Sequence, residues 1–322
     1  MKILITGVAG FIGFSLAYDF LKNSKKYQVY GIDSMDNYYS VKLKKLRVSK
    51  LKNFKNFKYF NKDITNRASL INFFKKKKFD IIFHFAAQAG VRYSNKQPKK
   101  YIKTNIFGFL NILDACINNP PKTIVYASSS SIYGDQKKFP LNEKSKLLPI
   151  NIYATSKILN EHIAEFYSKN YNTNFIGLRF FTVYGEWGRP DMFLLKIFNC
   201  FFKKSFFYLN NLGNHFRDFT YIKDVVIMIK KISFQNKGLK NHEIFNLCSN
   251  HPIKLKSVIS FLINEYGPIK IKKIKRNSLD VLKTHGDNKL IKRRTNFKKF
   301  TSIQLGIRNT FSWYKNYKIY KL

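Results

Sequence analysis

The chain has 322 residues, of which 45% are hydrophobic, so it can form one large α/β domain or two domains that share a cleft. Its 59 basic and 18 acidic residues give a formal net charge of +41, but the lysines are spread over nearly every segment. That spread argues against a dedicated nucleic-acid-binding protein, whereas the excess charge favours a phosphorylated substrate. The 3 cysteines include no Cys-x-x-Cys pair, so neither a disulfide framework nor a zinc or other metal site is indicated.

The start of the chain runs directly into an apolar strand and a glycine-rich loop, which indicates no signal peptide. No apolar run approaches the roughly 18 residues that span a membrane. We therefore expect a cytoplasmic protein with no membrane partner and no specific nucleic-acid partner.

Residues 3–5 form a short apolar run that predicts a strand, followed by Gly7, Gly10, Gly13 and a helical pattern. This order of strand, glycine turn and helix is the context of a dinucleotide-binding fingerprint, whose glycines let the backbone approach a pyrophosphate. Asp33 ends the second predicted strand, at the place where a carboxylate binds ribose hydroxyls and disfavours a 2'-phosphate. The pattern therefore predicts NAD rather than NADP.

The segment after Asp33 offers fewer functional signals. Residues 37–52 predict a basic helix that is solvated. Asp63 and Ile64 follow the third predicted strand and can contact adenine, although a helix N-cap explains Asp63 equally well. His84 lies inside an apolar strand and is interpreted as a packed core residue. Small residues from Ala86 onward leave room for the flat ring of a cofactor.

Residues 101–117 predict a long helix, and residues 123–127 predict the fifth strand. That strand opens into four consecutive serines, residues 128–131, at its C-terminal end. Ligands bind at this end of the strands in open parallel sheets. A serine-rich turn without function is the alternative interpretation for these residues alone.

Tyr153 and Lys157 stand four residues apart in a segment that reads as a helix, so their side chains emerge on one face. A tyrosine has a pKa near 10, so its use as a base at neutral pH requires about 4 kcal/mol of phenolate stabilisation. A neighbouring cation can supply much of it. The same spacing also arises by chance in a chain with 20 tyrosines and 59 basic residues, so the rest of the sequence must decide.

Strands and helices alternate through about residue 180, which predicts a doubly wound parallel sheet, a Rossmann-like α/β fold. Beyond that point the pattern loosens, and further helices are expected near residues 192–203, 223–231, 255–266 and 302–317. We expect residues 1–180 to form an NAD-binding domain. Residues 181–322 are expected to form a smaller mixed α/β substrate domain, partly interleaved with the first.

Several longer motifs are distinctive: GID with DNYY (31–33 and 36–39), AAQAGVRYS (86–94), YASSSS (126–131), LRFFTVYG with WGRPDM (178–185 and 187–192) and RDFTY (217–221). With the Gly-x-x-Gly-x-x-Gly spacing, they resemble extended short-chain dehydrogenase/reductases of the nucleotide-sugar epimerase group. The closest resemblance is to UDP-glucuronate 4-epimerases. It covers residues 3–224, and the last hundred residues match loosely.

The resemblance implies a role for each matching residue. Tyr153 corresponds to the general base, Lys157 to its cationic partner and Ser129 to the hydroxyl that hydrogen-bonds the sugar 4-oxygen. NAD would be held by Gly7, Gly10, Phe11, Ile12, Gly13, Asp33, Asp63, Ile64 and Ala86, together with Tyr153 and Lys157. The uronate carboxylate would contact Ser130, Ser131 and Thr182, and the sugar nucleotide would contact Arg92, Arg189 and Arg217, the last two at the pyrophosphate. Related enzymes commonly dimerise through the helices corresponding to residues 101–117 and 153–170, so a homodimer is expected.

The implied reaction is inversion of C4 of a UDP-sugar, most closely UDP-glucuronate to UDP-galacturonate, through a transient 4-keto intermediate. UDP-glucose 4-epimerase shares the base and the lysine and remains the alternative. A basic polyanion-binding protein on a Rossmann fold is the remote alternative. Ser130 and Ser131 stand where 4,6-dehydratases carry an Asp-Glu pair, and Ser131 stands where decarboxylating UDP-xylose synthases usually carry Glu.

Two departures from the pattern affect the substrate side. Glu186 stands where such enzymes often have proline, which places an acid near the expected phosphate contacts. The turn between Arg276 and Asp280 has lost its usual glycine, which puts nucleotide contacts by these two residues in doubt.

Overall fold

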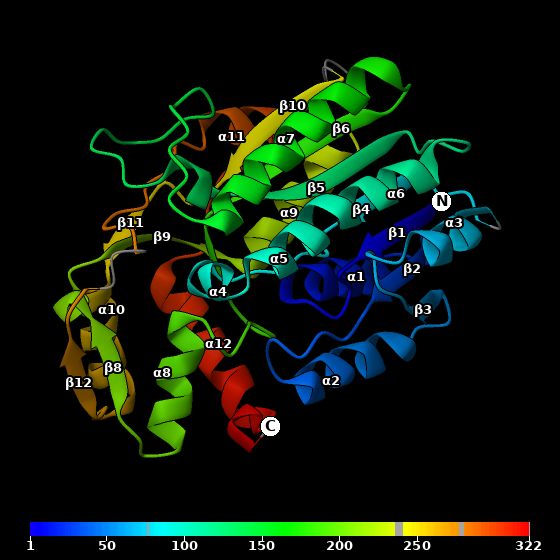
Figure 1. The fold of residues 1–322 in the computed structure, drawn as a ribbon. Coiled ribbons are helices and arrows are strands. Elements are labelled where there is room, and N and C mark those ends of the chain that lie inside the picture. The colour runs from blue at the N-terminus through cyan, green and yellow to red at the C-terminus, as the bar shows by residue number, and fades with distance from the viewer. Residues whose placement is uncertain (76, 236–240, 277–279, 322) are drawn as a thin grey trace.

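The computed structural model describes residues 1–75, 77–235, 241–276 and 280–321. Its main layer is a seven-stranded parallel sheet in the order β10-β6-β5-β4-β1-β2-β3 (Figure 1). The strands are β1 (Lys2–Thr6), β2 (Gln28–Asp33), β3 (Phe57–Asn61), β4 (Ile81–His84), β5 (Thr123–Ser129), β6 (Asn174–Phe180) and β10 (His242–Leu247). The predicted doubly wound parallel sheet is confirmed.

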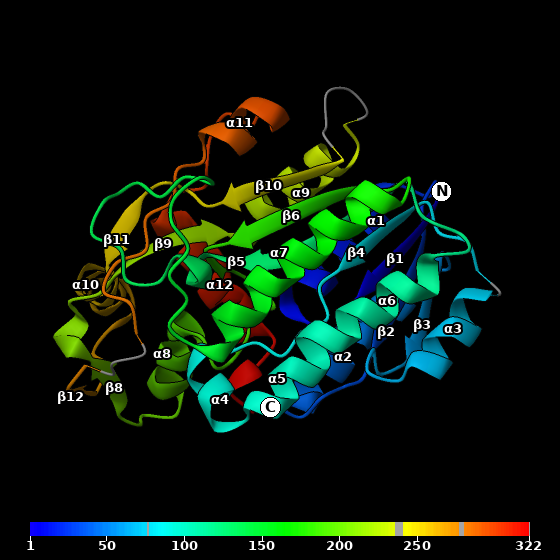
Figure 2. The same cartoon turned by 45° about the horizontal axis from the view of Figure 1, so that its top comes forward.

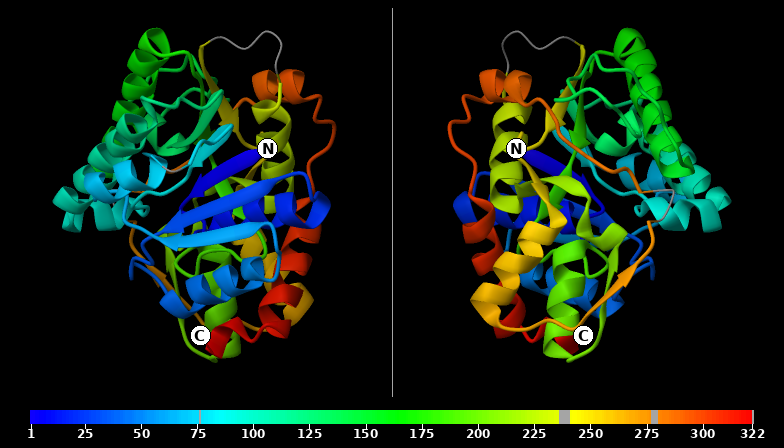
Figure 3. Two further views of the ribbon diagram at one scale, coloured as in Figure 1. Left: turned by 90° about the vertical axis from the view of Figure 1, so that its right-hand side faces the viewer. Right: turned by 90° about the vertical axis from the view of Figure 1, so that its left-hand side faces the viewer.

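Helices cover both faces of this sheet (Figure 3). One face carries α3 (Arg67–Lys75), α6 (Gly108–Cys116) and α7 (Ile152–Asn170), and the other carries α1 (Phe11–Asn23) and α9 (Ile222–Ser233). Alternate residues of β1 point to opposite faces of the sheet. Leu4 packs on the face that carries α3, α6 and α7, while Ile3 and Ile5 pack on the face that carries α1 and α9. A strand buried on both faces explains the continuous apolar run at residues 3–5.

The remaining elements form a smaller part beside the C-terminal ends of the main strands (Figures 1 and 2). It contains a three-stranded sheet and a two-stranded parallel pair, β8 with β12. Its elements are β7 (Thr182–Tyr184), β8 (Phe207–Asn210), β9 (Phe216–Tyr221), β11 (Pro252–Lys254), β12 (Ile271–Ile274), α8 (Phe193–Phe202), α10 (Leu255–Tyr266) and α12 (Ile303–Asn316). The helix α11 (Lys289–Thr295) contacts β10 and α9, and three short helices are η2 (Ser130–Tyr133), η3 (Asn211–Gly213) and η4 (Ile319–Lys321).

The helix expected at residues 101–117 is present, but part of it is π-helical rather than α-helical. It follows α4 (Val91–Lys96) and consists of α5 (Pro98–Tyr101), a π-helical stretch η1 (Ile102–Phe107) and α6, which run beside α7 in Figure 2. Within the π-helical stretch, Asn105 donates to Ser156 Oγ at 3.0 Å and accepts from the Gln88 amide at 2.8 Å. Single π-helical turns inside α-helices occur frequently at functional sites, and this one ties α7 to the segment after β4.

The helix α2 (Val41–Lys52) lies where the sequence predicts a helix, but the expectation that it is solvated is wrong. It packs against α1 and β3. Its buried residues are Leu43, Lys44, Arg47, Val48 and Leu51. Long basic side chains can bury their stems and even their charges, which a count of charged residues along a helix does not reveal.

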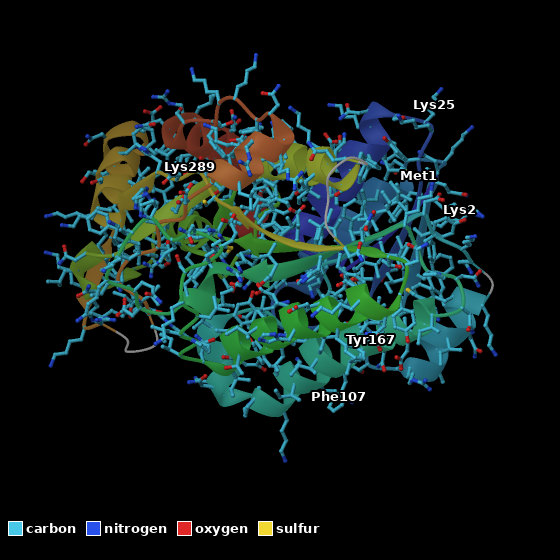
Figure 4. All side chains as sticks on the ribbon, turned by 90° about the horizontal axis from the view of Figure 1, so that it is seen from above. Met1, Lys2, Lys25, Phe107, Tyr167 and Lys289 are labelled. Carbon is cyan, nitrogen blue, oxygen red and sulfur yellow. The ribbon has the colours of Figure 1, made fainter. Side chains whose placement is uncertain are left out.

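The basic residues are distributed around the molecule. Lys289 lies at the opposite side of Figure 4 from Lys2 and Lys25. Among the described residues, no helix combines the length and the apolar character needed to cross a membrane.

Candidate active site

The three glycines at and after the loop between β1 and α1 have no room for a side chain. Gly7 has a φ of +69°, and a Cβ there would lie 2.7 Å from the Ala86 amide nitrogen. A Cβ at Gly13 would lie 2.3 Å from the Gly7 carbonyl oxygen. These residues therefore hold the loop against the end of β4 and bring the first turn of α1 to the same place, where unpaired helix amides favour an anion.

A cavity of about 520 Å³ opens along the C-terminal ends of the main strands, the place predicted for a ligand. All residues expected at the cofactor lie on its wall, namely Gly7, Gly10, Phe11, Ile12, Gly13, Asp33, Asp63, Ile64, Ala86, Tyr153 and Lys157. Ser129 and Arg189 also line it. The cavity thus brings the glycine loop and the Tyr153 helix to one space.

Asp33 is fixed beside the glycine loop at the end of β2. Its Oδ2 atom accepts from the Ala9 amide at 3.0 Å, and its Oδ1 atom accepts from the Met35 amide at 2.9 Å. Burial raises the pKa of this carboxyl, although Lys44 and the two amides oppose that rise. The carboxylate is therefore held in place at the cavity wall by the loop that it adjoins.

Asp63 lines the cavity, but it is not the N-cap of a helix. Its Oδ1 atom accepts from the Thr65 amide at 2.8 Å, whereas α3 begins at Arg67 and Asn66 Oδ1 accepts from the Ser69 amide at 3.0 Å. His84 is a packed core residue, as interpreted from the sequence. Its ring stacks on Phe109, its Nδ1 atom lies 3.0 Å from Thr6 Oγ1, and burial lowers its pKa to about 3.

Tyr153 and Lys157 emerge on one face of α7, as the spacing predicts. The helix begins after Asn151, whose side chain accepts from the Ala154 amide at 2.9 Å. Lys157 is buried, with only 3% of its surface exposed, whereas Tyr153 remains partly accessible from the cavity. The Lys157 Nζ atom lies 5.9 Å from the centre of the Tyr153 ring and donates to the Ala127 carbonyl at 2.8 Å.

The expected lowering of the Tyr153 pKa is not found. Burial raises the pKa of Tyr153, and a hydrogen bond from Ser129 and the charge of Arg189 only oppose this rise. Burial also lowers the pKa of Lys157 to about 8, while Glu161 acts in the opposite direction. The spacing of Tyr153 and Lys157 in the sequence predicts that a cation lies near the phenol. It does not predict how far burial shifts the pKa of both groups against their charged forms.

Ser129 belongs to a turn that a buried polar network holds. Its Oγ atom accepts from the Ser131 amide at 3.2 Å. The preceding Ser128 donates to Glu161 at 2.5 Å, and Glu161 receives two hydrogen bonds from Arg179, at 2.9 and 2.7 Å. Sequence reasoning missed Glu161 and Arg179, although a carboxylate one helical turn beyond Lys157 was a usable signal.

The three residues expected to bind the carboxylate of the sugar do not line the main cavity. Ser130 and Ser131 form the first turn of η2, are partly exposed and do not line the main cavity. Thr182 begins β7 and lines a smaller hollow that also has Arg189 and Met192 on its wall. The hollow and the main cavity therefore share Arg189.

The arginines fall into two groups. Arg189 lines the cavity, where its Nε atom donates to Asp191 Oδ1 at 3.0 Å and its guanidinium lies over the Tyr38 ring at 5.6 Å. The second group surrounds Asp280. Arg92 forms an ion pair with Asp280, and Arg276 donates to the Asp280 carbonyl at 3.3 Å.

Arg217 belongs to this second group and does not line the main cavity. Burial lowers its pKa to about 10, with Asp280 opposing and Arg92 and Arg276 adding to the effect. The cluster thus gathers three cations, and it includes Arg276 and Asp280, which the altered turn had put in doubt. Residues 277–279 of that turn lie outside the described residues.

Glu186 contacts residues other than these arginines. It accepts from the Tyr221 hydroxyl at 2.7 Å and pairs with the Lys223 ammonium at 3.2 Å. Its charge is therefore compensated by Lys223, on the helix α9.

Comparison with known proteins agrees with this arrangement. Residues 3–248 match the family model described as the NAD dependent epimerase/dehydratase family. An uncharacterized protein of Methanocaldococcus jannaschii is 40% identical over 97% of this chain and 96% of its own length. UDP-glucuronate 4-epimerase 4 of Arabidopsis thaliana is 36% identical over 98% of this chain and 76% of its own.

Among solved structures, the UDP-glucuronic acid 4-epimerase of Bacillus cereus in complex with UDP-glucuronic acid and NAD is 28% identical. It superimposes with a TM-score of 0.92 over 98% of this chain and 100% of its own. The resemblance to nucleotide-sugar epimerases is thereby confirmed. The chain belongs to the NAD dependent epimerase/dehydratase family and is an NAD-dependent enzyme.

Proposed function

We propose that this enzyme inverts C4 of UDP-glucuronate to give UDP-galacturonate. The observation that carries the proposal is the set of Tyr153, Lys157 and Ser129 at one cavity wall, with the glycine loop and Asp33 on the same cavity. Relatives and a solved neighbour that are named for this reaction support the choice of substrate. UDP-glucose is the competing substrate.

The residues that line the cavity fit NAD. The glycines of this loop have no room for side chains, and the Asp33 carboxylate is held at the end of β2, where an adenosine ribose binds in such folds. Lys157 and Tyr153 would hold the nicotinamide side, and Asp63, Ile64 and Ala86 the adenine and pyrophosphate side. Bound NAD supplies a reversible acceptor for the hydrogen of a carbon that bears a hydroxyl.

The side chains of this protein would handle the proton and the orientation. Tyr153 takes the proton of the 4-hydroxyl, and Ser129 donates a hydrogen bond that orients the 4-oxygen. Because burial raises the Tyr153 pKa, the phenolate requires nearby cations, and Lys157 and Arg189 supply them in this chain. Oxidation at C4 followed by reduction from the other face leaves no net redox change, so the cofactor is not consumed.

The substrate contacts follow from charge and hydrogen-bonding capacity. Arg189 at the cavity, with Arg92 and Arg217 in the neighbouring cluster, would bind the UDP portion, because a guanidinium presents paired donors to phosphate. Ser130, Ser131 and Thr182 would hold the uronate carboxylate with neutral hydroxyls. We infer that residues 1–180 supply most of the cofactor site and residues 181–322 most of the substrate site, interleaved through β10 and α9.

We also propose a homodimer that forms through α6 and α7. Several large apolar side chains on and beside these helices are exposed, among them Phe107, Ile117, Leu159 and Phe166. Helices that carry such side chains on an outward face are candidates for a subunit interface.

The experiment that tests the function is incubation of the purified protein with UDP-glucuronate and, separately, with UDP-glucose, followed by identification of the products by NMR. UDP-galacturonate from the first substrate alone supports the proposal. UDP-galactose from the second would reassign the enzyme to neutral sugars, and a pentose product would indicate decarboxylation.

A further inference from the structure

Arg47 lies outside the cavity on α2, and no part of it is exposed. Its guanidinium donates four hydrogen bonds, to the carbonyl oxygens of Ala9 (2.7 Å), Trp187 (2.5 Å) and Gly188 (2.9 Å) and to the Tyr39 hydroxyl (2.8 Å). Among the described residues, every hydrogen-bond acceptor of this cation is a neutral oxygen, and its Nε atom has no acceptor.

Burying this guanidinium costs desolvation free energy. A guanidinium removed from water without a carboxylate partner regains its hydration only through dipoles, and a hydrophobic residue of similar volume would avoid the cost. An arginine at this position must therefore do something that an apolar side chain cannot. Its geometry indicates what that is, because its carbonyl partners belong to two loops that are far apart in the sequence.

The first loop is the glycine-rich loop. Ala9 lies between Gly7 and Gly10, and its amide donates to Asp33 while its carbonyl accepts from Arg47. One peptide segment is thus fixed by the carboxylate on one side and by the guanidinium on the other. The charge of Arg47 also opposes the rise that burial causes in the pKa of Asp33.

The second loop carries Arg189 into the cavity, since Trp187 and Gly188 directly precede it. Trp187 has a φ of +61°, a left-handed conformation that a bulky residue adopts only when its surroundings hold it there. Its ring packs at 5.0 Å from Phe14 and at 5.3 Å from Trp313. Aromatic packing therefore holds the side chain of this loop, and Arg47 holds its backbone.

We propose that Arg47 is a positioning residue that fixes the Arg189 loop relative to the glycine loop, so that UDP-sugar and NAD are held in one mutual geometry. The proposal rests on the proposed function in that it takes the UDP portion as the ligand of Arg189. Only an arginine fits this role, because its planar fork reaches three carbonyls and a hydroxyl at once, whereas a lysine ammonium is a single point of attachment.

The test measures the affinity for UDP and for NAD by calorimetry in Arg47→Met, Arg189→Met and the double variant, with Leu51→Ala as the control. Leu51 is fully buried on the same helix and makes no hydrogen bond from its side chain, so its truncation reports a general loss of stability. We expect Arg47→Met to weaken UDP binding by roughly tenfold or more, a size typical of coupling between sites. Leu51→Ala should leave the affinity within about twofold of the wild type once the protein is confirmed as folded.

The double variant separates positioning from direct effects. If Arg47 acts through Arg189, then Arg47→Met should weaken UDP binding little further, by about twofold or less, once Arg189→Met is present. The proposal would be overturned if the double variant lost UDP affinity by the full product of the two single losses. It would also be overturned if Leu51→Ala lost as much UDP affinity as Arg47→Met, or if Arg47→Met kept the wild-type affinity. If Arg47→Met does not fold, Arg47→Lys decides, since it keeps the charge but not the fork and should still lose affinity, whereas wild-type affinity would overturn the proposal.

Calorimetry requires no turnover, so this test and that of the proposed function fail separately. A wild-type protein that binds UDP and NAD but converts no UDP-glucuronate would refute the proposed substrate and leave the role of Arg47 measurable. A wild type that converts UDP-glucuronate, with an Arg47→Met variant of unchanged affinity, would refute the positioning role alone.

Discussion

The ammonium of Lys157 lies 5.9 Å from the centre of the Tyr153 ring, and both side chains project from the first two turns of α7. The helix itself therefore places the two groups side by side. Burial nevertheless raises the pKa of the phenol and lowers that of the ammonium, because it disfavours the charged form of each group. This arrangement and the surroundings of the pair have consequences that can be measured.

Replacing Tyr153 by Phe should abolish most turnover and leave NAD binding intact, because the ring is kept and only the proton acceptor is lost. General acid-base catalysis contributes about 10² to 10⁴ in rate, so we expect a loss in that range in kcat measured by product formation. Tyr167→Phe is the matched control, since Tyr167 lies on the same helix and hydrogen-bonds Asp114 instead. Near-wild-type turnover in Tyr153→Phe would remove this residue from the mechanism.

The buried Lys157 should make stability depend on pH. Its pKa of about 8 in the folded protein lies below the ordinary value, so between about pH 8 and pH 10 the unfolded chain binds more protons than the folded one. The contribution of Lys157 to the free energy of unfolding therefore increases by about 2 kcal/mol between pH 8 and pH 10. Urea unfolding at both pH values should show this gain in the wild type relative to Lys157→Met.

Lys169→Met serves as the control for that measurement. Lys169 lies on the same helix but is exposed and paired with Glu165, so its removal should leave the pH dependence of stability as it is in the wild type. An identical pH dependence in the wild type and in Lys157→Met would show that the ammonium is not buried as described.

Asp33→Asn should weaken NAD binding by roughly tenfold or more, since hydrogen bonds to a carboxylate contribute about 1.5 to 3 kcal/mol. Calorimetric titration with NAD measures this directly. Asp80→Asn is the control, because Asp80 also accepts from a backbone amide, that of Lys2, but at the opposite end of β1. Equal NAD affinity in the two variants would refute the assignment of Asp33 to the ribose.

The proposed dimer can be broken at its most exposed apolar residue. Phe166 on α7 is 61% exposed, and Phe166→Lys should place a charge in the interface and halve the mass measured by light scattering. Tyr208→Lys, at a residue of the smaller part that is 56% exposed, should leave the mass unchanged. A wild type that is already monomeric would exclude the dimer.

The sequence predicted those features that are encoded locally. The order of strand, glycine turn and helix predicted the glycine loop that lines the cavity, and the spacing of Tyr153 and Lys157 predicted that both side chains emerge on one face of α7. Other features depend on distant partners. The three carbonyl acceptors of Arg47 lie 38, 140 and 141 residues away, and only the Tyr39 hydroxyl is local, so the sequence around α2 does not reveal that this charge is buried.

The pKa shifts and buried ion pairs of the site could not be predicted from the sequence either. The pKa of Tyr153 depends on how completely the fold removes it from water, and no spacing contains that quantity. Likewise, Arg179 belongs to β6 and Glu161 to α7, and only the packing of the helix on the sheet makes them a pair. A buried ion pair of this kind is visible in a sequence only as two unremarkable charged residues.

The proposed route inverts the configuration of C4 by removal and return of the hydrogen on that carbon within one active site. The most direct test is conversion of UDP-glucuronate that carries deuterium at C4, with NMR of the product. Inversion by this route predicts UDP-galacturonate that retains the deuterium at C4. A product that has exchanged this deuterium with water, or that has exchanged hydrogen at C5 instead, would contradict it.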